Sequence, residues 1–202
     1  PSIEAFEKVI TSKTKAIILC NPNNPTGYLY SNDEVKELAR ICKEHNLYLI
    51  SDEAYREFCY DTTEPYLSPI QIEGLEENVI LIDTVSKRYS SCGARVGALV
   101  TKNKSVYNTA MKFAQARLSP PGLGQILGEA AVDLPADYFN EPKAEYQSRR
   151  DLLVNRLNEM EGVFCPMPGG AFYAIARLPI DDGDTFCQWL LEKFTYENQT
   201  VM

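Results

Sequence analysis

Residues 84–95, with the sequence TVSKRYSSCGAR, bring a lysine, two arginines and several hydroxyl groups into one short segment. A lysine amine can act as a nucleophile or carry a proton, and an arginine can bind an anion through two parallel hydrogen bonds. The segment therefore supplies local cations of the kind that can hold one small anionic ligand. By position alone, however, Lys87 is better explained as an ordinary surface lysine.

Polar residues also follow other apolar segments of the chain. Asn24, Asp52 and the pair Ser86 and Lys87 each come directly after such a segment. In open α/β sheets, ligands bind beyond the carboxyl ends of the strands. If the apolar segments are neighbouring parallel strands, these polar residues lie at one edge of the sheet and form a candidate site.

Four short apolar segments without polar alternation predict strands that are buried on both faces of a mostly parallel sheet. They cover residues 16–20, 47–50, 79–82 and 98–100. Between the first two, the capping box at 31–34 predicts the start of a helix. Its apolar face carries Val35, Leu38, Ala39, Ile41 and Cys42. This pattern indicates an α/β fold.

The pattern of residue types changes near residue 140. A charged helix is predicted from Asn140 to about Glu161, and a last helix over 185–194. Between them, 162–165 and 170–175 predict two strands joined by a Pro/Gly-rich turn. These elements indicate a second, smaller α+β unit that begins at residue 140.

The composition excludes several classes of protein. With 45% hydrophobic and 24% charged residues among 202, the chain is globular in composition rather than disordered, collagen-like or coiled-coil. No apolar run approaches the roughly 20 residues of a membrane-spanning helix, so no membrane association is expected. The net charge of −8 argues against nucleic acid as a partner.

The single histidine and the scattered cysteines exclude further chemistry. His45 stands in the string KEHN, which is typical of a surface position at a helix end rather than of a nucleophile–histidine site. The six cysteines form no CxxC pair and no Cys/His cluster, so we expect no metal site. Reduced, packed thiols indicate a cytoplasmic location.

Three blocks of sequence together resemble the signatures of class I and II aminotransferases, fold-type I enzymes that use pyridoxal 5′-phosphate (PLP). The blocks are NPNNPTG at 21–27, SDEAY at 51–55, and TVSK with GARVG at 84–97. Their order, each after a predicted strand, makes the resemblance specific over about residues 1–180. It implies an α/β, PLP-dependent transferase-like large domain at 1–139 and part of a small C-terminal domain at 140–202.

The resemblance assigns roles to residues around the cofactor ring. Lys87 matches the catalytic lysine that forms a Schiff base with PLP and moves a proton. Asp52 matches the carboxylate that keeps the pyridine nitrogen protonated. Tyr55 and Asn24 match the groups that hydrogen-bond the phenolic oxygen. Without the resemblance, Asp52 is also explained as a helix cap, Tyr55 as a half-buried aromatic and Asn24 as a turn residue.

Phosphate contacts are implied for a second group of residues. Arg95 matches a guanidinium that binds the phosphate, and Thr84 matches a hydroxyl that is often serine in relatives. Ser86 either reaches the phosphate or orients Lys87. Gly93 and Gly97 are expected to allow close backbone approach around Arg95.

Parts of the family pattern have no counterpart in this sequence. The upstream loop that receives part of the phosphate is missing, as is the C-terminal arginine that binds the substrate carboxylate. The segment 169–173 resembles one that lines the substrate entrance. We therefore expect an internal or C-terminal fragment of a longer enzyme, with little PLP retention and no turnover by itself.

The implied activity is transfer of an amino group between an amino acid and a 2-oxo acid, by an enzyme that is a homodimer when full length. A PLP-dependent lyase or synthase shares the same motifs and stays an alternative. A non-catalytic PLP- or amino-acid-sensing module of a regulator is a third possibility. The sequence does not choose the substrate amino acid.

Overall fold

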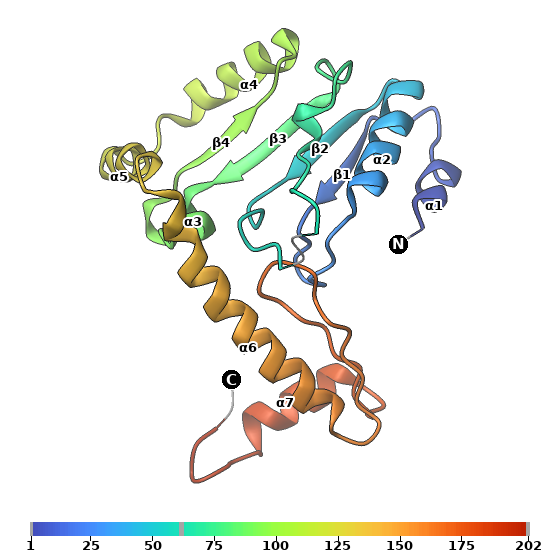
Figure 1. The fold of residues 1–202 in the computed structure, drawn as a ribbon, viewed down its shortest axis with the longest axis vertical. Helices are drawn as coiled ribbons and strands as arrows, with labels where there is room; N and C mark the ends of the chain where they lie inside the picture. The colour runs from blue at the N-terminus through green and yellow to red at the C-terminus, as the bar shows by residue number, and fades with distance from the viewer. Residues whose placement is uncertain (1, 61–62, 201–202) are drawn as a thin grey trace.

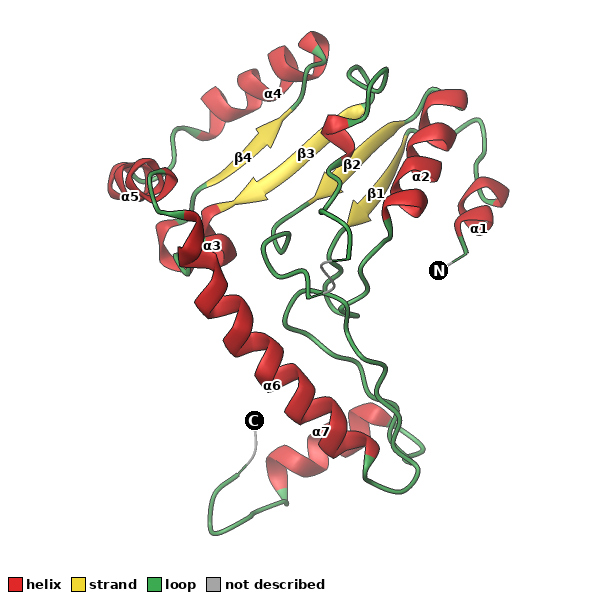
Figure 2. Ribbon diagram, in the orientation of Figure 1, coloured by secondary structure: helices red, strands yellow, loops and turns green. Residues whose placement is uncertain are grey.

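The computed structural model describes residues 2–60 and 63–200 of the chain. Its centre is a four-stranded sheet with the strand order β1-β2-β3-β4 (Figures 1 and 2). The strands are β1 (Ala16–Cys20), β2 (Tyr48–Asp52), β3 (Val79–Thr84) and β4 (Gly97–Val100). The first three are parallel and β4 is antiparallel to β3. The predicted α/β class with a mostly parallel sheet is confirmed, and each of the four predicted apolar segments forms a strand.

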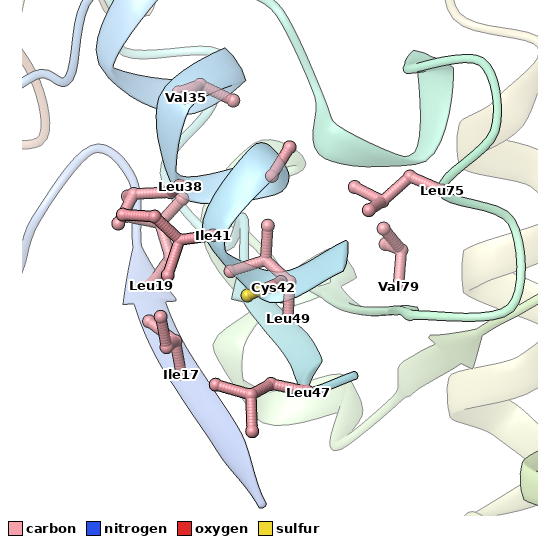
Figure 3. Close-up of a cluster of buried hydrophobic side chains, with 11 residues drawn as sticks. Ile17, Leu19, Val35, Leu38, Ile41, Cys42, Leu47, Leu49, Leu75 and Val79 are labelled. Atoms are coloured by element: carbon pink, nitrogen blue, oxygen red, sulfur yellow. The ribbon is translucent and has the colours of Figure 1, made fainter. Parts of the chain in front are cut away.

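The helix α2 (Asn32–Glu44) crosses from β1 to β2 and forms the main hydrophobic core with the sheet (Figure 3). The predicted capping box is present, because the Ser31 side chain accepts from the Glu34 amide and the Glu34 side chain accepts from the Ser31 amide. All residues of the predicted apolar face are buried: Val35, Leu38, Ala39, Ile41 and Cys42. His45 caps the end of α2 and is exposed, as expected.

The prediction that the strands are buried on both faces is wrong. Along β1, Leu19 is 1% exposed beneath α2, whereas Ile18 on the opposite face is 73% exposed. All residues of β4 are exposed as well. An unbroken apolar run places apolar side chains on both faces of its strand, but among the described residues only one face of the sheet is fully packed. Burial therefore alternates along β1, although its sequence is apolar throughout.

Further helices lie in the rest of the described chain. They are α1 (Ile3–Lys8), α3 (Val85–Arg88), α4 (Lys104–Arg117), α5 (Gly122–Val132), α6 (Asn140–Asn158) and α7 (Gly183–Glu192), with 3₁₀ turns at Pro69–Gln71, Cys92–Ala94 and Ala136–Phe139. The long helix α6 leads away from the sheet, and α7 lies near its far end (Figure 1). Both correspond to predicted helices. No helix in the described ranges is long and apolar enough to cross a bilayer.

The two predicted strands at 162–165 and 170–175 are wrong. Phe164 and Arg177 exchange two backbone hydrogen bonds of 3.0 and 2.8 Å, but they form only an isolated bridge. Prolines at 166 and 168 lack the amide donors that a ladder between these segments needs. The segment after them bonds to the first half of the chain instead, where the amide of Gly170 donates to the carbonyl of Gly27.

Candidate functional site

The carboxyl ends of β1, β2 and β3 lie at the same edge of the sheet. Cys20 pairs in register with Asp52, and Asp52 pairs with Ile82. Backbone hydrogen bonds continue just past the strands, since the amide of Asn21 donates to the carbonyl of Asp52 over 3.0 Å. The polar residues that follow these strands therefore leave the sheet side by side, as a parallel arrangement requires.

Hydroxyl and guanidinium groups line a hollow at the end of β3. Thr84, Ser86 and Arg95 all border it, and its volume is about 390 Å³. The Thr84 hydroxyl caps the short helix α3 by accepting from the Ser86 amide over 3.1 Å. It also donates to the Ser86 hydroxyl over 2.9 Å. The three residues that the resemblance assigned to phosphate thus share one cavity, and their donors suit an anion.

Cys92 joins three of the predicted site residues. The Lys87 Nζ lies 3.6 Å from the Cys92 sulfur, and that thiol donates to the Ser86 carbonyl over 3.3 Å. Arg95 donates from its guanidinium to the Cys92 carbonyl over 3.0 Å. Arg95 has φ +55°, a conformation that costs a side-chain-bearing residue on the order of 1 kcal/mol or more. The turn after α3 therefore holds the lysine and the arginine near each other.

The residues assigned to the cofactor ring bond to other neighbours in this structure. The Asp52 carboxylate accepts from the Ala54 amide over 3.1 Å, so it caps the turn that follows β2. Asn24 is exposed, and its backbone amide donates to the Cys20 sulfur over 3.5 Å. Tyr55 is buried, and its hydroxyl lies 2.6 Å from that of Tyr173. Burial, followed by the hydrogen bond with Tyr173, raises the pKa of Tyr55.

The structure thus links Thr84, Ser86, Lys87 and Arg95 directly or through Cys92. Asn24, Asp52 and Tyr55 stand on the neighbouring strand ends. Sequence reasoning missed both Cys92 and the contact of Tyr173 with Tyr55. The signal for Cys92 was its place in the Lys87–Arg95 turn, whereas no local pattern brings Tyr173 to Tyr55.

An ion-pair network joins α3 and the end of β3 to the segment that follows β2, and it was also not predicted. Arg88, the residue after Lys87, donates to the Asp83 carboxylate over 2.6 Å and has its Nε 3.2 Å from the Glu57 carboxylate. Arg56 lies 3.7 Å from Asp83 and 3.6 Å from Glu53. The network therefore connects the helix that carries Lys87 with the segment that carries Asp52 and Tyr55.

Glu53 is the most deeply buried member of this network and predicts a pH-dependent stability. Its side chain is fully buried and accepts from Ser68 over 2.5 Å and from Ser51 over 3.1 Å. Burial raises the pKa of Glu53, against the opposing effect of both serines and of Arg56. The folded state thus holds this proton more tightly than the unfolded chain does. The contribution of Glu53 to stability is therefore complete below pH about 4.3 and is lost as the pH rises through the folded pKa.

We expect Glu53→Gln to remove this titration and to flatten the dependence of the unfolding free energy on pH. The change in slope can reach about 1.4 kcal/mol per pH unit, the limit for one proton. Urea unfolding at a series of pH values above 4 measures it. Glu159→Gln, at a side chain 63% exposed, serves as the control. A slope in Glu53→Gln equal to that of the unaltered protein would contradict this assignment.

The two glycines that flank Arg95 are not equivalent. A Cβ at Gly97 would lie 2.9 Å from the Asp83 carbonyl oxygen, whereas a Cβ at Gly93 meets no atom within 4 Å among the described residues. The expectation of close approach is therefore confirmed for Gly97 and wrong for Gly93. We expect Gly97→Ala to lower the unfolding free energy by about 1–3 kcal/mol through overpacking. Gly93→Ala should change it by less than about 0.5 kcal/mol, and equal losses measured by urea unfolding would refute the distinction.

Comparison with known proteins extends over most of the chain. The model of the protein family aminotransferase class I and II matches residues 2–197 of this chain. The aspartate aminotransferase of Rhizobium meliloti (strain 1021) is 31% identical over 203 aligned positions, which cover 94% of this chain and 49% of that protein. The chain therefore spans about half the length of this curated relative.

Solved structures give the same result. The aromatic aminotransferase of Pyrococcus horikoshii OT3 has a TM-score of 0.86 and 29% identity, and the match covers 96% of this chain and 52% of that one. The alanine aminotransferase of Pyrococcus furiosus has a TM-score of 0.80 and 32% identity, covering 91% and 47%. Since a family profile, a sequence relative and two structures agree over nearly all of its length, the chain belongs to the aminotransferase class I and II family.

Proposed function

We propose that the full-length protein is an aminotransferase that moves an amino group between an amino acid and a 2-oxo acid with PLP. The observation that carries the proposal is the hollow bordered by Thr84, Ser86 and Arg95, with Lys87 on the helix that begins there. Two hydroxyls and a guanidinium form a donor set suited to a phosphate. The cofactor of the family therefore fits the residues that are present.

PLP, when bound, supplies an aldehyde carbon and an electron-withdrawing ring. Thr84, Ser86 and Arg95 would bind its phosphate. Asp52, at the end of the neighbouring strand, would keep the ring nitrogen protonated. Tyr55 and Asn24 would bind the phenolic oxygen, and the raised pKa of Tyr55 supports a role as a hydrogen-bond donor there.

Lys87 is the proposed catalytic residue. Its amine would anchor the cofactor and then act as the base and acid that moves a proton of the substrate. The turn through Cys92 places the lysine amine beside the thiol and within one linked group with Ser86 and Arg95. That arrangement supports a lysine held at the phosphate end of the site.

The substrate is proposed only as a class. The relatives reported above are named for aspartate, aromatic and alanine substrates, and the two solved structures both match the fold of this chain, with TM-scores of 0.86 and 0.80. The shared core therefore carries the amino-group chemistry and does not distinguish the side chain.

Two measurements on the full-length protein test the proposal. Incubation with PLP and borohydride, followed by peptide mass spectrometry, should place the cofactor mass on Lys87. Incubation with PLP, an amino acid and 2-oxoglutarate should give a 2-oxo acid and glutamate. Release of ammonia and pyruvate would instead indicate a lyase, and absence of label on Lys87 would refute the PLP site.

The organisation of the full-length protein is proposed in the same way. We propose a homodimer, because aminotransferases of this family are typically dimers, and light scattering of the full-length protein tests it. The division into a large domain at 1–139 and a small one at 140–202 stays a prediction. It is supported by the course of α6, which begins at Asn140 and leads away from the sheet (Figure 1). The six free cysteines support a reducing, cytoplasmic location.

A further inference from the structure

Two tyrosine hydroxyls meet at the edge of the proposed cofactor site, although they are 118 residues apart in the sequence. The Tyr55 and Tyr173 oxygens are 2.6 Å apart, and either one can be the donor. Their rings meet edge to face with centroids 5.4 Å apart. Tyr55 is only 6% exposed, so Tyr173 is a principal polar neighbour of its hydroxyl.

The backbone before Tyr173 is fixed to the first half of the chain. The Gly170 amide donates to the Gly27 carbonyl over 3.0 Å, and the Ala171 amide donates to the Phe58 carbonyl over 2.9 Å. A Cβ at Gly170 would lie 2.6 Å from that of Pro22, so the two segments are in direct contact. The turn that carries Asn24 therefore packs against the segment that carries Tyr173.

Aromatic rings complete the support of this pair. Phe172 stacks on Tyr146 of α6 with centroids 4.7 Å apart, and it contacts the Tyr55 ring edge to face at 5.1 Å. The Tyr60 hydroxyl donates to the Ala171 carbonyl over 2.5 Å. Both the backbone and the neighbouring rings thus hold the Tyr173 hydroxyl at Tyr55, as preorganised sites require.

We propose that Tyr173 is a positioning residue, whose hydroxyl orients that of Tyr55 toward the phenolic oxygen of the cofactor. The inference rests on the proposed function for the role of Tyr55. While the site is free, either hydroxyl can donate to the other. When Tyr55 turns its proton toward an anionic oxygen, the Tyr173 hydroxyl rotates and donates to Tyr55 in its place. Two hydroxyls can exchange these roles because each is both donor and acceptor.

The chemistry of Tyr55 agrees with this arrangement. Burial, and after it the hydrogen bond with Tyr173, raises the pKa of Tyr55. A tyrosine that keeps its proton can donate to an oxyanion, whereas an ionised one would repel it. Removing the Tyr173 hydroxyl should therefore shift the pKa of Tyr55, while the ring packing persists.

The first test uses the cofactor-free full-length protein labelled with 3-fluorotyrosine. The ¹⁹F resonance of Tyr55 is assigned by its loss in Tyr55→Phe and is followed through a pH titration. We expect Tyr173→Phe to shift the titration midpoint of Tyr55, because the hydroxyl that bonds to its oxygen is gone. Tyr146→Phe, which removes a hydroxyl from the same aromatic cluster, should leave the midpoint unchanged. An unchanged Tyr55 midpoint in Tyr173→Phe would overturn the proposal.

The second test measures PLP affinity in a double-mutant cycle. Tyr173→Phe should weaken binding roughly fivefold, the effect of one hydrogen bond. The double variant Tyr55→Phe/Tyr173→Phe should bind no more weakly than Tyr55→Phe alone, because Tyr173 acts through Tyr55. Additive losses would mean that Tyr173 acts independently of Tyr55, and would refute the inference.

The two tests separate this inference from the proposed function. If the unaltered full-length protein does not bind PLP, the proposed function fails, and the fluorine titration alone decides whether Tyr173 controls Tyr55. If PLP binds and labels Lys87 but the cycle is additive, the proposed function stands and the role of Tyr173 is wrong.

Discussion

Replacing Lys87 by arginine is expected to lower kcat/KM of the full-length enzyme for amino-group transfer by about 10²–10⁴-fold or more. Arginine keeps the positive charge beside Cys92 and Ser86. It cannot release its proton near neutral pH, so it can act neither as the nucleophile nor as the base. The loss therefore measures the chemistry of the amine rather than the charge of the site.

The matched control is Lys36→Arg, at a side chain 60% exposed whose amine pairs with the surface carboxylate of Asp33. It should leave kcat/KM unchanged. Borohydride reduction in the presence of PLP should fix no cofactor at residue 87 in Lys87→Arg. If Lys87→Arg kept more than a tenth of the activity, or if cofactor were fixed at another lysine in the unaltered enzyme, Lys87 would not be the catalytic residue.

The sequence predicted elements whose signals are local. The capping box at Ser31 and the 3.6-residue period of α2 depend on residues within one or two turns of each other, and both are present. The strands followed in the same way from short apolar runs. Because β1, β2 and β3 are parallel, their order also placed Asn24, Asp52 and Lys87 at one edge, so local pattern and one topological rule were enough to predict a candidate site there.

Features that depend on distant partners could not be predicted. Whether Ile18 is covered depends on what packs against the second face of the sheet, which the run AIILC does not specify. The residues around Phe172 have the composition of a strand. Their backbone donors instead bond to carbonyls of the NPNNPTG turn and of Phe58, more than one hundred residues earlier. Composition gives the propensity of a segment and not its partner.

The side-chain contacts of the site show the same division. The turn from Lys87 to Arg95 is short, so its residues, Cys92 included, could be grouped from sequence. The contacts that the Cys92 thiol and carbonyl make could not be predicted. The Tyr55–Tyr173 contact and the Arg88–Asp83 ion pair arise only when separate elements are placed in space. Resemblance to a family assigns residues to the cofactor, and it is silent on the neighbours that hold them.

The Arg88–Asp83 pair gives the largest expected effect on stability. Their side chains are 14% and 16% exposed, and Arg88 also lies beside Glu57. In Arg88→Met the carboxylates of Asp83 and Glu57 stay in poorly solvated positions, and Arg56 is the cation that remains beside them. A buried pair broken on one side costs about 3–5 kcal/mol, and partial exposure and Arg56 reduce this to about 2–4 kcal/mol.

Urea unfolding of Arg88→Met measures the loss, with Arg156→Met as the control. The Arg156–Glu159 pair has side chains 69% and 63% exposed, so its removal should cost less than about 0.5 kcal/mol. The double variant Asp83→Ala/Arg88→Met should lose less than the sum of the single losses, because it removes both charges of the pair. Additive losses would show that the two residues act separately. Arg88 follows Lys87 on the one-turn helix α3. A loss of about 2–4 kcal/mol in Arg88→Met would therefore mean that the ion pair, more than the helix itself, holds α3 and with it Lys87 against the end of β3.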